Sequence, residues 1–263
     1  MQVSFDLISD LHVETWDDLF NWEGMPTSMM AVVAGDVSRD RELLVRALEN
    51  LTEQYKLVIF VDGNDEHRYG LENLAESYSS LKDELAHLEN FYYLQNNVVV
   101  IDGIAFLGCN AWWTYDFDNA ESYDESKEYF TERYCVSMEA ANLVEAQAYQ
   151  DVKHMLEQVK KLQTHPDVKE IVLVTHTVPD VSLVQHDIDL EGTHLLNCTG
   201  NRLINKVFLE DTESKIHTWV FGHYHGDVDQ VLHGVRFVNN ARGRGNTPWS
   251  KNVYNAKKIL IEL

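Results

Sequence analysis

Basic side chains are scarce in this chain of 263 residues: Lys and Arg number 21 against 43 Asp and Glu, which gives a formal net charge of −22. Proteins that bind nucleic acid need clustered Lys and Arg, so this balance disfavours nucleic acid as a partner. It disfavours docking on anionic lipid for the same reason. The chain also lacks an apolar run of about 18 residues, the length a transmembrane helix needs, so we expect no membrane partner.

Cysteine and proline are also rare, with three and four residues. Cys109, Cys135 and Cys198 are widely spaced and form no Cys-x-x-Cys pair, which predicts isolated thiols in a reducing compartment.

The first residues lack the basic region of a secretory signal, so we expect a cytoplasmic protein. No linker rich in Pro, Gly or Ser divides the chain, which favours one domain over residues 1–263. No feature of the sequence predicts an oligomeric state.

Motifs of several enzyme classes are missing. The sequence contains no Gly-x-x-x-x-Gly-Lys-Ser/Thr loop, no Gly-x-Ser-x-Gly elbow and no Gly-x-Gly-x-x-Gly turn. The P-loop, α/β-hydrolase and dinucleotide-binding classes therefore have no support.

Apolar strands alternate with amphipathic helices in the first third of the chain, which predicts βαβ units and an α/β fold. We expect strands at 2–9, 29–34 and 57–61, and helices at 40–55 and 71–88. Short strands at 92–94, 98–101 and 104–107 resemble a meander. The longest helix is expected at 137–162, and further strands at 171–175, 219–221, 235–238 and 259–263.

An acidic, aromatic stretch near 112–134 has weak periodicity, and we interpret it as an insertion or lid-like loop. Its residues Trp112, Trp113 and Tyr115 follow a strand, so we expect them to serve packing rather than to stack on a ligand. Glu14, which follows the first strand closely, is expected in a solvated loop.

Five predicted strands are each followed at once by side chains that can bind metal. Because sites form at the carboxyl ends of strands in α/β sheets, these side chains are expected to converge. The segments are Ile8-Ser9-Asp10-Leu11-His12, Val33-Ala34-Gly35-Asp36, Phe60-Val61-Asp62-Gly63-Asn64-Asp65-Glu66, Val172-Leu173-Val174-Thr175-His176 and Val220-Phe221-Gly222-His223-Tyr224-His225.

The donor set comprises two carboxylates, one amide oxygen and four imidazoles. This set is too rich for one tetrahedral zinc and suits two ions that share a bridging carboxylate, about 3.5–4 Å apart. Manganese is our first expectation, and iron, zinc, nickel, cobalt and magnesium are alternatives. Each segment alone has a simpler explanation, such as a turn Asp or a structural His. The ordered set of five is a much stronger signal.

On these five segments the chain resembles the calcineurin-like metallophosphoesterases, whose pattern runs Asp-x-His, Gly-Asp, Gly-Asn-His-Asp/Glu, His and Gly-His-x-His. The segments 110–117 and 240–243 are similar to stretches of one bacterial and phage-like branch. The resemblance implies an α-β-β-α sandwich of four layers, with two mixed sheets flanked by helices. It also implies a binuclear metal centre and hydrolysis of phosphoesters, in which a hydroxide bridging the metals attacks phosphorus in line with the leaving oxygen.

The resemblance assigns metal ligands by position. The first metal is expected on Asp10, His12, Asp36 and His225. The second is expected on Asn64, His176 and His223, with Asp36 as the bridge. Arg242, in the segment Asn240-Ala241-Arg242-Gly243, is expected either to stabilise phosphoryl oxygens or to lie in a solvated turn.

One position departs from the family pattern. The family has a catalytic His after Gly-Asn, where this chain has Asp65. A carboxylate there repels phosphate and supplies no imidazole proton, so we predict slow turnover or a preference for good leaving groups. His67 is considered as a substitute, although a turn of two residues usually changes the direction of the side chain.

These features predict a hydrolase that depends on two metals and acts on phosphomonoesters or phosphodiesters. A small soluble phosphate compound is favoured over a phosphoprotein as substrate. The alternative is a catalytically weakened metal-binding scaffold, or a binding protein, of the same fold.

Overall fold

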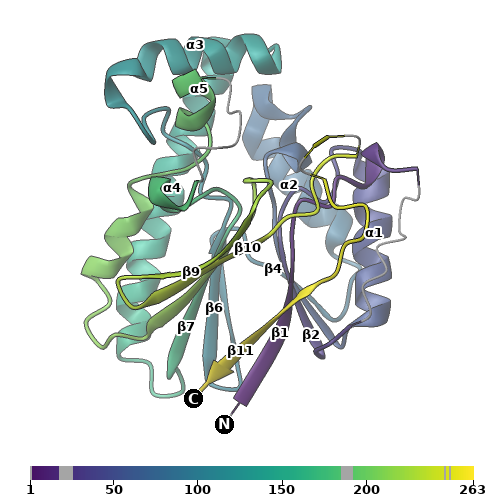
Figure 1. The fold of residues 1–263 in the computed structure, drawn as a ribbon, viewed down its shortest axis with the longest axis vertical. Helices are drawn as coiled ribbons and strands as arrows, with labels where there is room; N and C mark the ends of the chain where they lie inside the picture. Colours follow the sequence, from purple (N-terminus) through teal and green to yellow (C-terminus); the bar gives the residue numbers. More distant parts are fainter. Residues whose placement is uncertain (1, 18–25, 185–191, 246, 249) are drawn as a thin grey trace.

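The computed structural model describes residues 2–17, 26–184, 192–245, 247–248 and 250–263, and contains two β-sheets flanked by helices (Figure 1). The first sheet has the strand order β11-β1-β2-β3-β4, in which β1 to β4 run parallel and β11 is antiparallel to β1. Its strands are β1 (Gln2–Ile8), β2 (Met30–Ala34), β3 (Leu57–Val61), β4 (Phe91–Tyr93) and β11 (Lys257–Glu262).

Two helices connect the parallel strands of this sheet. Helix α1 (Arg41–Gln54) joins β2 to β3, and α2 (Leu74–Leu85) joins β3 to β4. The carboxylate of Asp40 begins α1 by accepting the backbone N–H of Leu43 at 3.0 Å, which satisfies one of the free donors of the first turn.

The second sheet has the strand order β5-β6-β7-β8-β10-β9. Strands β6, β7, β8 and β10 are parallel, while β5 and β9 are antiparallel edge strands, so both sheets are mixed. The strands are β5 (Asn97–Ile101), β6 (Ile104–Cys109), β7 (Glu170–Thr175), β8 (Ile216–Phe221), β9 (Asp227–Leu232) and β10 (Val235–Asn240).

The two sheets pack face to face, and helices cover both outer faces. Phe5, Leu7, Ile59, Phe106 and Val174 are buried in the core between the sheets. Leucines of α1 and α2 pack on the outer face of the first sheet. On the other side, α4 (Met138–Gln163) covers the second sheet. The predicted α-β-β-α sandwich of four layers is therefore confirmed.

Helix α4 illustrates how the sequence dictates this packing. Val152, Met155, Val159 and Leu162 recur at intervals of three or four residues, so they lie on one face of the helix. All four are buried against the second sheet. Ser137 begins the helix by accepting the N–H of Ala140 at 3.1 Å.

The predicted meander is wrong in its first strand. Strand β4 pairs in parallel with β3 in the first sheet, whereas β5 and β6 form a hairpin in the second sheet. The chain crosses between the sheets near Leu94, which is fully buried in the core between them. Periodicity alone cannot show such a crossing, because all three strands are short and apolar.

The acidic stretch near 112–134 is more ordered than a lid-like loop. It contains a 3₁₀ turn (Ala120–Ser122) and helix α3 (Tyr123–Tyr134), which packs beside α5 (Gly192–Asn197) and α4. Only Ser126, Lys127 and Phe130 of α3 are buried, which explains the weak apolar periodicity. Trp112, Trp113 and Tyr115 are fully buried, as expected for packing residues.

Both chain termini lie at one end of the sandwich, and α3 lies at the opposite end (Figure 1). The parallel strands β1 to β3 therefore direct their carboxyl ends toward α3. In the described part of the chain, no helix has the length and apolar character needed to cross a bilayer.

Candidate metal centre

The five predicted segments meet at the carboxyl ends of adjacent strands. Asp10 and His12 follow β1, Asp36 follows β2, and Asn64 follows β3, so the first sheet contributes from three neighbouring strands. His176 follows β7, and His223 and His225 follow β8, its neighbour in the second sheet. The structure brings all seven predicted ligands together at this edge, as expected from the position of sites in α/β sheets.

The backbone turns sharply at four of these seven residues. Asp10, His12, Asp36 and His223 have φ angles of 51°, 42°, 52° and 62°, in the left-handed region that residues other than glycine rarely adopt. Such strain persists only where the surroundings fix the chain. Here the N–H of Asp10 donates to the carbonyl of Gly35 at 2.9 Å, and the N–H of His12 donates to that of Asp36 at 3.1 Å.

The first group of ligand atoms comprises Asp10, His12 and His225. Nε2 of His12 lies 3.0 Å from Nε2 of His225, and Nε2 of His225 lies 3.5 Å from Oδ1 of Asp10. The backbone N–H of His223 donates to both oxygens of Asp10, at 3.0 and 3.1 Å, and so fixes that carboxylate.

The second group comprises Asp36, His176 and His223, with Asn64 beside them. Nε2 of His176 lies 3.3 Å from Oδ1 of Asp36, 3.2 Å from Oδ1 of Asn64 and 3.2 Å from Nδ1 of His223. Asp36 also approaches the first group, because its Oδ2 lies 3.8 Å from Nε2 of His12. One oxygen of Asp36 therefore faces each group.

The orientation of two imidazoles suits a cation. Nδ1 of His176 lies 2.8 Å from the carbonyl oxygen of Ala34, and Nε2 of His223 lies 3.2 Å from that of Cys198. A carbonyl can only accept, so these nitrogens carry the protons in the neutral rings. The opposite nitrogens then present lone pairs to each other at 3.2 Å. Two facing lone pairs repel unless a proton or metal ion lies beside them, so the donor set fits a metal.

The charges around these imidazoles also favour a bound cation. Burial lowers the pKa of His176, but the charge of Asp36 outweighs it and raises the pKa to about 10. Burial and the neighbouring His176 lower the pKa of His223 to about 4. Burial raises the pKa of Asp10, yet the hydrogen bond from His225 and the nearby imidazoles bring it to about 2. The carboxylates thus favour a positive charge within the group.

Three glycines leave the space in which these ligands sit. A Cβ on Gly35 would lie 2.5 Å from Nδ1 of His176, and one on Gly222 would lie 2.8 Å from Oδ2 of Asp10. A Cβ on Gly63 would collide with Oδ1 of Asp36. No other residue type fits at these three positions without displacing a predicted ligand, which is the reason three of the five segments contain glycine.

Glu66 is a buried positioning residue to which the sequence analysis gave no role. Its carboxylate accepts four backbone N–H groups, from Asp36, Val37, Ser38 and Gly63, at 2.6–3.2 Å. It therefore joins the loops after β2 and β3 and fixes Asp36 from behind. Burial and the charge of Asp36 raise the pKa of Glu66, whereas the N–H groups that it accepts favour its ionised form. Its place as the last residue of the third segment was the available signal.

Asp65, which replaces the family's histidine, lies at the edge of the centre. Its backbone N–H donates to Oδ1 of Asp36 at 2.8 Å. Its Oδ2 lies 3.3 Å from Nδ1 of His12 and 2.5 Å from Nη2 of Arg244. Burial raises the pKa of Asp65, but His12 and Arg244 together hold it well below its ordinary value.

His67 is not placed as a substitute for the missing histidine. Its Nε2 lies 3.0 Å from Oδ2 of Asp62, and its Nδ1 lies 2.8 Å from Oγ of Ser77. The ring is fully buried and packs on Tyr78. Both nitrogens are thus engaged in a buried network away from the cavity-lining residues.

Arg242 is also placed away from the cavity. Its side chain is fully buried, and the guanidinium stacks over the ring of Trp16 at 4.0 Å. This excludes the solvated turn that was one of its two expected settings. The arginine that does line the cavity is Arg244, which the sequence analysis missed. Glu14, expected in a solvated loop, has an 8% exposed side chain and lies 3.9 Å from Nη1 of Arg244.

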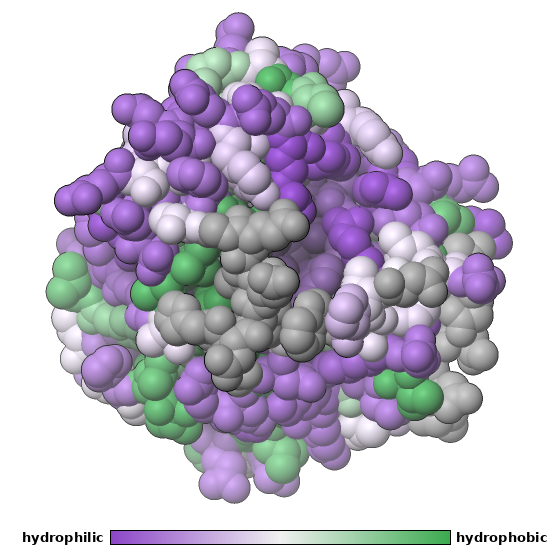
Figure 2. Space-filling model, turned by 45° about the horizontal axis from the view of Figure 1, so that its top comes forward, coloured by the Kyte–Doolittle hydropathy of each residue, from purple (hydrophilic) through white to green (hydrophobic). Residues whose placement is uncertain are grey.

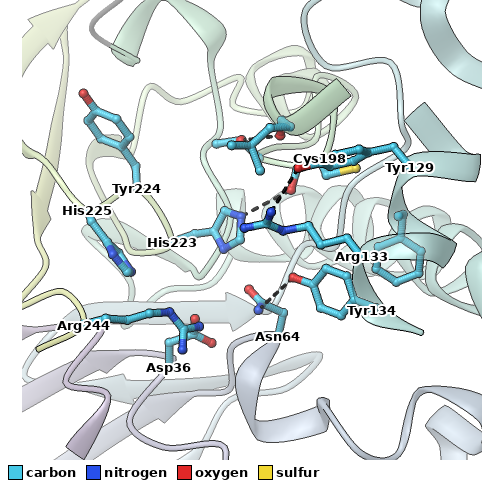
Figure 3. A pocket seen from close by; sticks show the side chains of 13 residues that line it. Asp36, Asn64, Tyr129, Arg133, Tyr134, Cys198, His223, Tyr224, His225 and Arg244 are labelled. Atoms are coloured by element: carbon cyan, nitrogen blue, oxygen red, sulfur yellow. Dashed lines mark hydrogen bonds between the residues drawn. The ribbon is translucent and has the colours of Figure 1, made fainter. Parts of the chain in front are cut away.

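The ligand groups open into a cavity of about 330 Å³. In Figure 2, which turns this end of the molecule forward, hydrophilic side chains border a hollow. Figure 3 shows Arg133 reaching from α3 toward His223, and Tyr134 lying beside Asn64. The lining residues are Asp36, Asn64, Tyr129, Phe130, Arg133, Tyr134, Leu195, Cys198, Thr199, His223, Tyr224, His225 and Arg244.

Sequence comparison finds a distant viral relative of this chain. No protein-family model matches the chain. Protein L509 of Acanthamoeba polyphaga mimivirus is 20% identical over 258 residues, which cover 90% of this chain and 89% of that protein.

Solved structures show the same fold. The crystal structure of phosphopantetheinyl hydrolase from Mycobacterium tuberculosis has a TM-score of 0.71 and 20% identity, over 98% of this chain and 96% of that chain. A Staphylococcus aureus structure assigned as a 5′-nucleotidase has a TM-score of 0.51 and 14% identity, over the whole of this chain and 51% of that one. These likenesses confirm the predicted fold, an α-β-β-α sandwich with two mixed sheets.

Proposed function

We propose that this protein is a metal-dependent phosphohydrolase with a binuclear centre. The observation that carries the proposal is the position of Asp36, whose two carboxylate oxygens face two separate groups of imidazoles and carboxylates. A shared carboxylate between two ligand groups is the arrangement that two-metal hydrolases use. The Mycobacterium tuberculosis structure of the same fold, which is named a hydrolase, supports the proposal.

The residues present fit two ions. Asp10, His12, Asp36 and His225 would hold one of them. The second would be held by Asp36, Asn64, His176 and His223. This mixture of imidazole nitrogen and oxygen donors suits borderline ions, of which we propose manganese first, with iron, zinc, nickel, cobalt or magnesium as alternatives. When bound, two such ions lower the pKa of a coordinated water and neutralise charge on phosphoryl oxygens.

The chain's own residues then position the phosphate. Arg244 lines the cavity together with Asp36 and Asn64, so its guanidinium can contact phosphoryl oxygens while it pairs with Asp65. This pair offsets the repulsion that a lone carboxylate at position 65 would exert on an anionic substrate.

The same position governs which leaving groups are suitable. The carboxylate of Asp65, held ionised by Arg244 and His12, carries no proton for a departing alkoxide. Loss of a general acid typically costs about 10²–10⁴-fold in rate. We therefore propose that the enzyme acts on compounds whose leaving group departs without protonation, such as aryl esters or pyrophosphates.

The substrate we propose is a small soluble phosphate compound rather than a phosphoprotein. A long polyanion such as nucleic acid would be repelled by the chain's net charge of −22. We propose cytoplasmic action, in line with the isolated cysteines, all three of which are free in the structure.

A chromogenic assay tests the proposal. The protein, reconstituted with Mn²⁺, is assayed on an aryl phosphomonoester and an aryl phosphodiester, with Asp36→Asn as the control that removes the bridging carboxylate. Turnover of either ester by the wild type, and its loss in the variant, would support a hydrolase. Equal background rates in both proteins would contradict it.

The alternative is a metal-binding scaffold of the same fold with little catalytic power. The presence of Asp65 where the family has histidine is the one observation in its favour. Metal binding without turnover of any phosphate ester or anhydride would select this alternative.

A further inference from the structure

A second cavity of about 280 Å³ adjoins the candidate metal centre. Arg133, Tyr134 and Arg244 line both cavities, so the two cavities are neighbours that share these side chains. The complete lining of the second cavity is Arg39, Asp65, Arg68, Arg133, Tyr134 and Arg244. We name it the arginine cavity.

Four guanidinium groups in one place are unexpected in this protein. The chain has nine arginines, and it carries 43 acidic against 21 basic residues. Two carboxylates partly neutralise the group: Asp65 lies 2.5 Å from Nη2 of Arg244, and Glu14 lies 3.6 Å from Nε of Arg39. Across the described ranges, no carboxylate lies within 4.0 Å of the other two arginines, Arg68 and Arg133. The arginine cavity thus has an excess of positive charge.

The unpaired guanidinium groups are held in place by neutral contacts. Arg68 stacks on the ring of Tyr134 at 3.9 Å, and its Nη2 donates to the backbone carbonyl of Arg133 at 3.3 Å. Nη1 of Arg133 donates to the hydroxyl of Tyr129 at 3.1 Å. The hydroxyl of Tyr134 in turn accepts from Nδ2 of the predicted ligand Asn64 at 3.4 Å. Planar guanidinium groups fixed in this way suit the oxygens of a phosphate.

Among the described residues, no imidazole other than those of predicted metal ligands lines either cavity to protonate an alkoxide. His223 and His225, both predicted metal ligands, are the histidines that line the metal-centre cavity, and none lines the arginine cavity in the described part of the chain. A leaving phosphate differs from an alkoxide because it is a stable anion at neutral pH. It needs positive charge at its destination rather than a proton donor.

We propose that the arginine cavity binds the leaving phosphate of a phosphoanhydride, and hence that the substrate is a small compound with two linked phosphate groups. The inference rests on the proposed function and narrows its substrate class. A water oxygen bonds to the first phosphorus while the bond from that phosphorus to the bridging oxygen breaks. The bridging oxygen keeps the electron pair and leaves as part of the second phosphate, and the water proton passes to solvent. The products are two separate phosphates.

A binding measurement tests the arginine cavity without turnover. Protein loaded with Mn²⁺ is titrated by calorimetry with methylenediphosphonate, which cannot be hydrolysed, and with methylphosphonate, which lacks the second anionic group. Metal analysis after each titration checks that the ions stay bound. The wild type should bind the diphosphonate at least tenfold more tightly. The variants Arg68→Gln/Arg133→Gln and Arg133→Gln alone should lose most of this preference.

The control is Lys160→Gln, which makes the same change of charge on a side chain that is 75% exposed near the end of α4. This variant should keep the preference. The inference is overturned if the wild type shows no preference, or if the control loses as much as the arginine variants. The single variant alters an exposed residue of α3, so it keeps the test valid if the double variant is unstable.

A rate measurement separates this inference from the proposed function. The quantity is the ratio of kcat/KM for inorganic pyrophosphate to kcat/KM for an aryl phosphomonoester. The double arginine variant should lower this ratio at least tenfold, and an unchanged ratio would overturn the inference. If wild-type protein hydrolyses neither compound and no aryl phosphodiester, the proposed function fails, and the calorimetry still decides whether the arginine cavity recognises a second phosphate.

Discussion

Arg244 and Asp65 form a close ion pair at the edge of the candidate metal centre, with Nη2 of the arginine 2.5 Å from Oδ2 of the carboxylate. The pair occupies the place where the family resemblance leads one to expect a histidine. A carboxylate next to a phosphate site is repulsive by itself, but here it is matched by a guanidinium that also lines the cavity. The pair therefore replaces the proton donor of the family pattern, and its arginine offsets the repulsion between Asp65 and an anionic substrate.

The first prediction concerns the missing general acid. Asp65→His should raise kcat for an alkyl phosphomonoester by about 10²-fold, because an imidazole can protonate the leaving alkoxide. The rate on an aryl ester should change much less. Steady-state kinetics on both esters provides the measurement. Asp65→Asn is the matched control, since it removes the charge without adding an acid. An equal gain in the two variants would show that charge, not proton transfer, limits the rate.

The second prediction concerns Glu66, whose carboxylate accepts four backbone N–H groups. Glu66→Gln turns an amide NH₂ toward these donors and leaves at least one without an acceptor. The free energy of unfolding should fall by about 3 kcal/mol, with weaker metal binding, because buried unsatisfied donors are costly. Urea denaturation and metal titration measure the two effects. The same change at exposed Glu89 should leave both quantities within error, and comparable losses there would refute the positioning role.

The third prediction concerns the space that Gly63 leaves for Asp36. Gly63→Ala places a methyl group against Oδ1 of Asp36 and near the ring of His176, so metal affinity should fall at least tenfold. Gly234→Ala is the control: its φ of +84° costs about 1 kcal/mol of stability for any other residue, but nothing lies within 4 Å of the added methyl. Calorimetric metal titration compares the two variants. Unchanged affinity in Gly63→Ala would mean that Asp36 is not a ligand.

The fourth prediction concerns stability at acid pH. The pKa of Asp229 is lowered to about 2, chiefly by hydrogen bonds from Arg236 across the β9–β10 hairpin. Because the folded pKa lies below the unfolded value of about 3.9, the stabilisation is present above that value and is lost as pH falls toward 2. The side chain is 34% exposed, so the effect should be less than about 1 kcal/mol. Urea unfolding of wild type and Asp229→Asn at neutral and acid pH should show a difference only near neutrality; a constant difference would contradict this.

The positions of the predicted ligands could be derived from sequence because each follows a strand. Strand ends fix where a side chain lies, and parallel neighbours share one edge, so Asp10, Asp36 and Asn64 had to be close to one another. The roles of these residues as metal ligands remain predictions that metal analysis must test. The α-β-β-α sandwich could also be predicted from the sequence, since apolar periodicity marks the strands and helices that form its layers.

The arginine of the site could not be derived in the same way. Arg242 and Arg244 are two residues apart and would point the same way in extended chain. Gly243 between them has a φ of +81°, which breaks this alternation, so Arg242 stacks on Trp16 while Arg244 enters the cavity. A positive φ at one glycine is set by tertiary contacts and leaves no periodic signal in the sequence.

A similar local turn explains why the side chain of His67 faces away from the metal centre. Residues Asp65–His67 form a 3₁₀ helix, in which each residue is rotated by about 120° from the one before, so side chains two apart diverge. Asp65 faces Arg244, and His67 faces Asp62 and Ser77. The contribution of α3 could not be predicted for another reason. Arg133 and Tyr134 reach the cavity because α3 packs beside α5, a helix far from it in the sequence.

The number of metal ions bound per chain is the decisive measurement for a binuclear centre. The protein is stripped with a chelator, reconstituted with Mn²⁺, freed of excess ion by gel filtration and analysed by elemental mass spectrometry, with Asp36→Asn treated in parallel. The account predicts two ions per wild-type chain and a clear deficit in the variant, since Asp36 faces both ligand groups. Wild-type protein that retains no transition metal, or a variant that retains as much as the wild type, would contradict a binuclear centre at these residues.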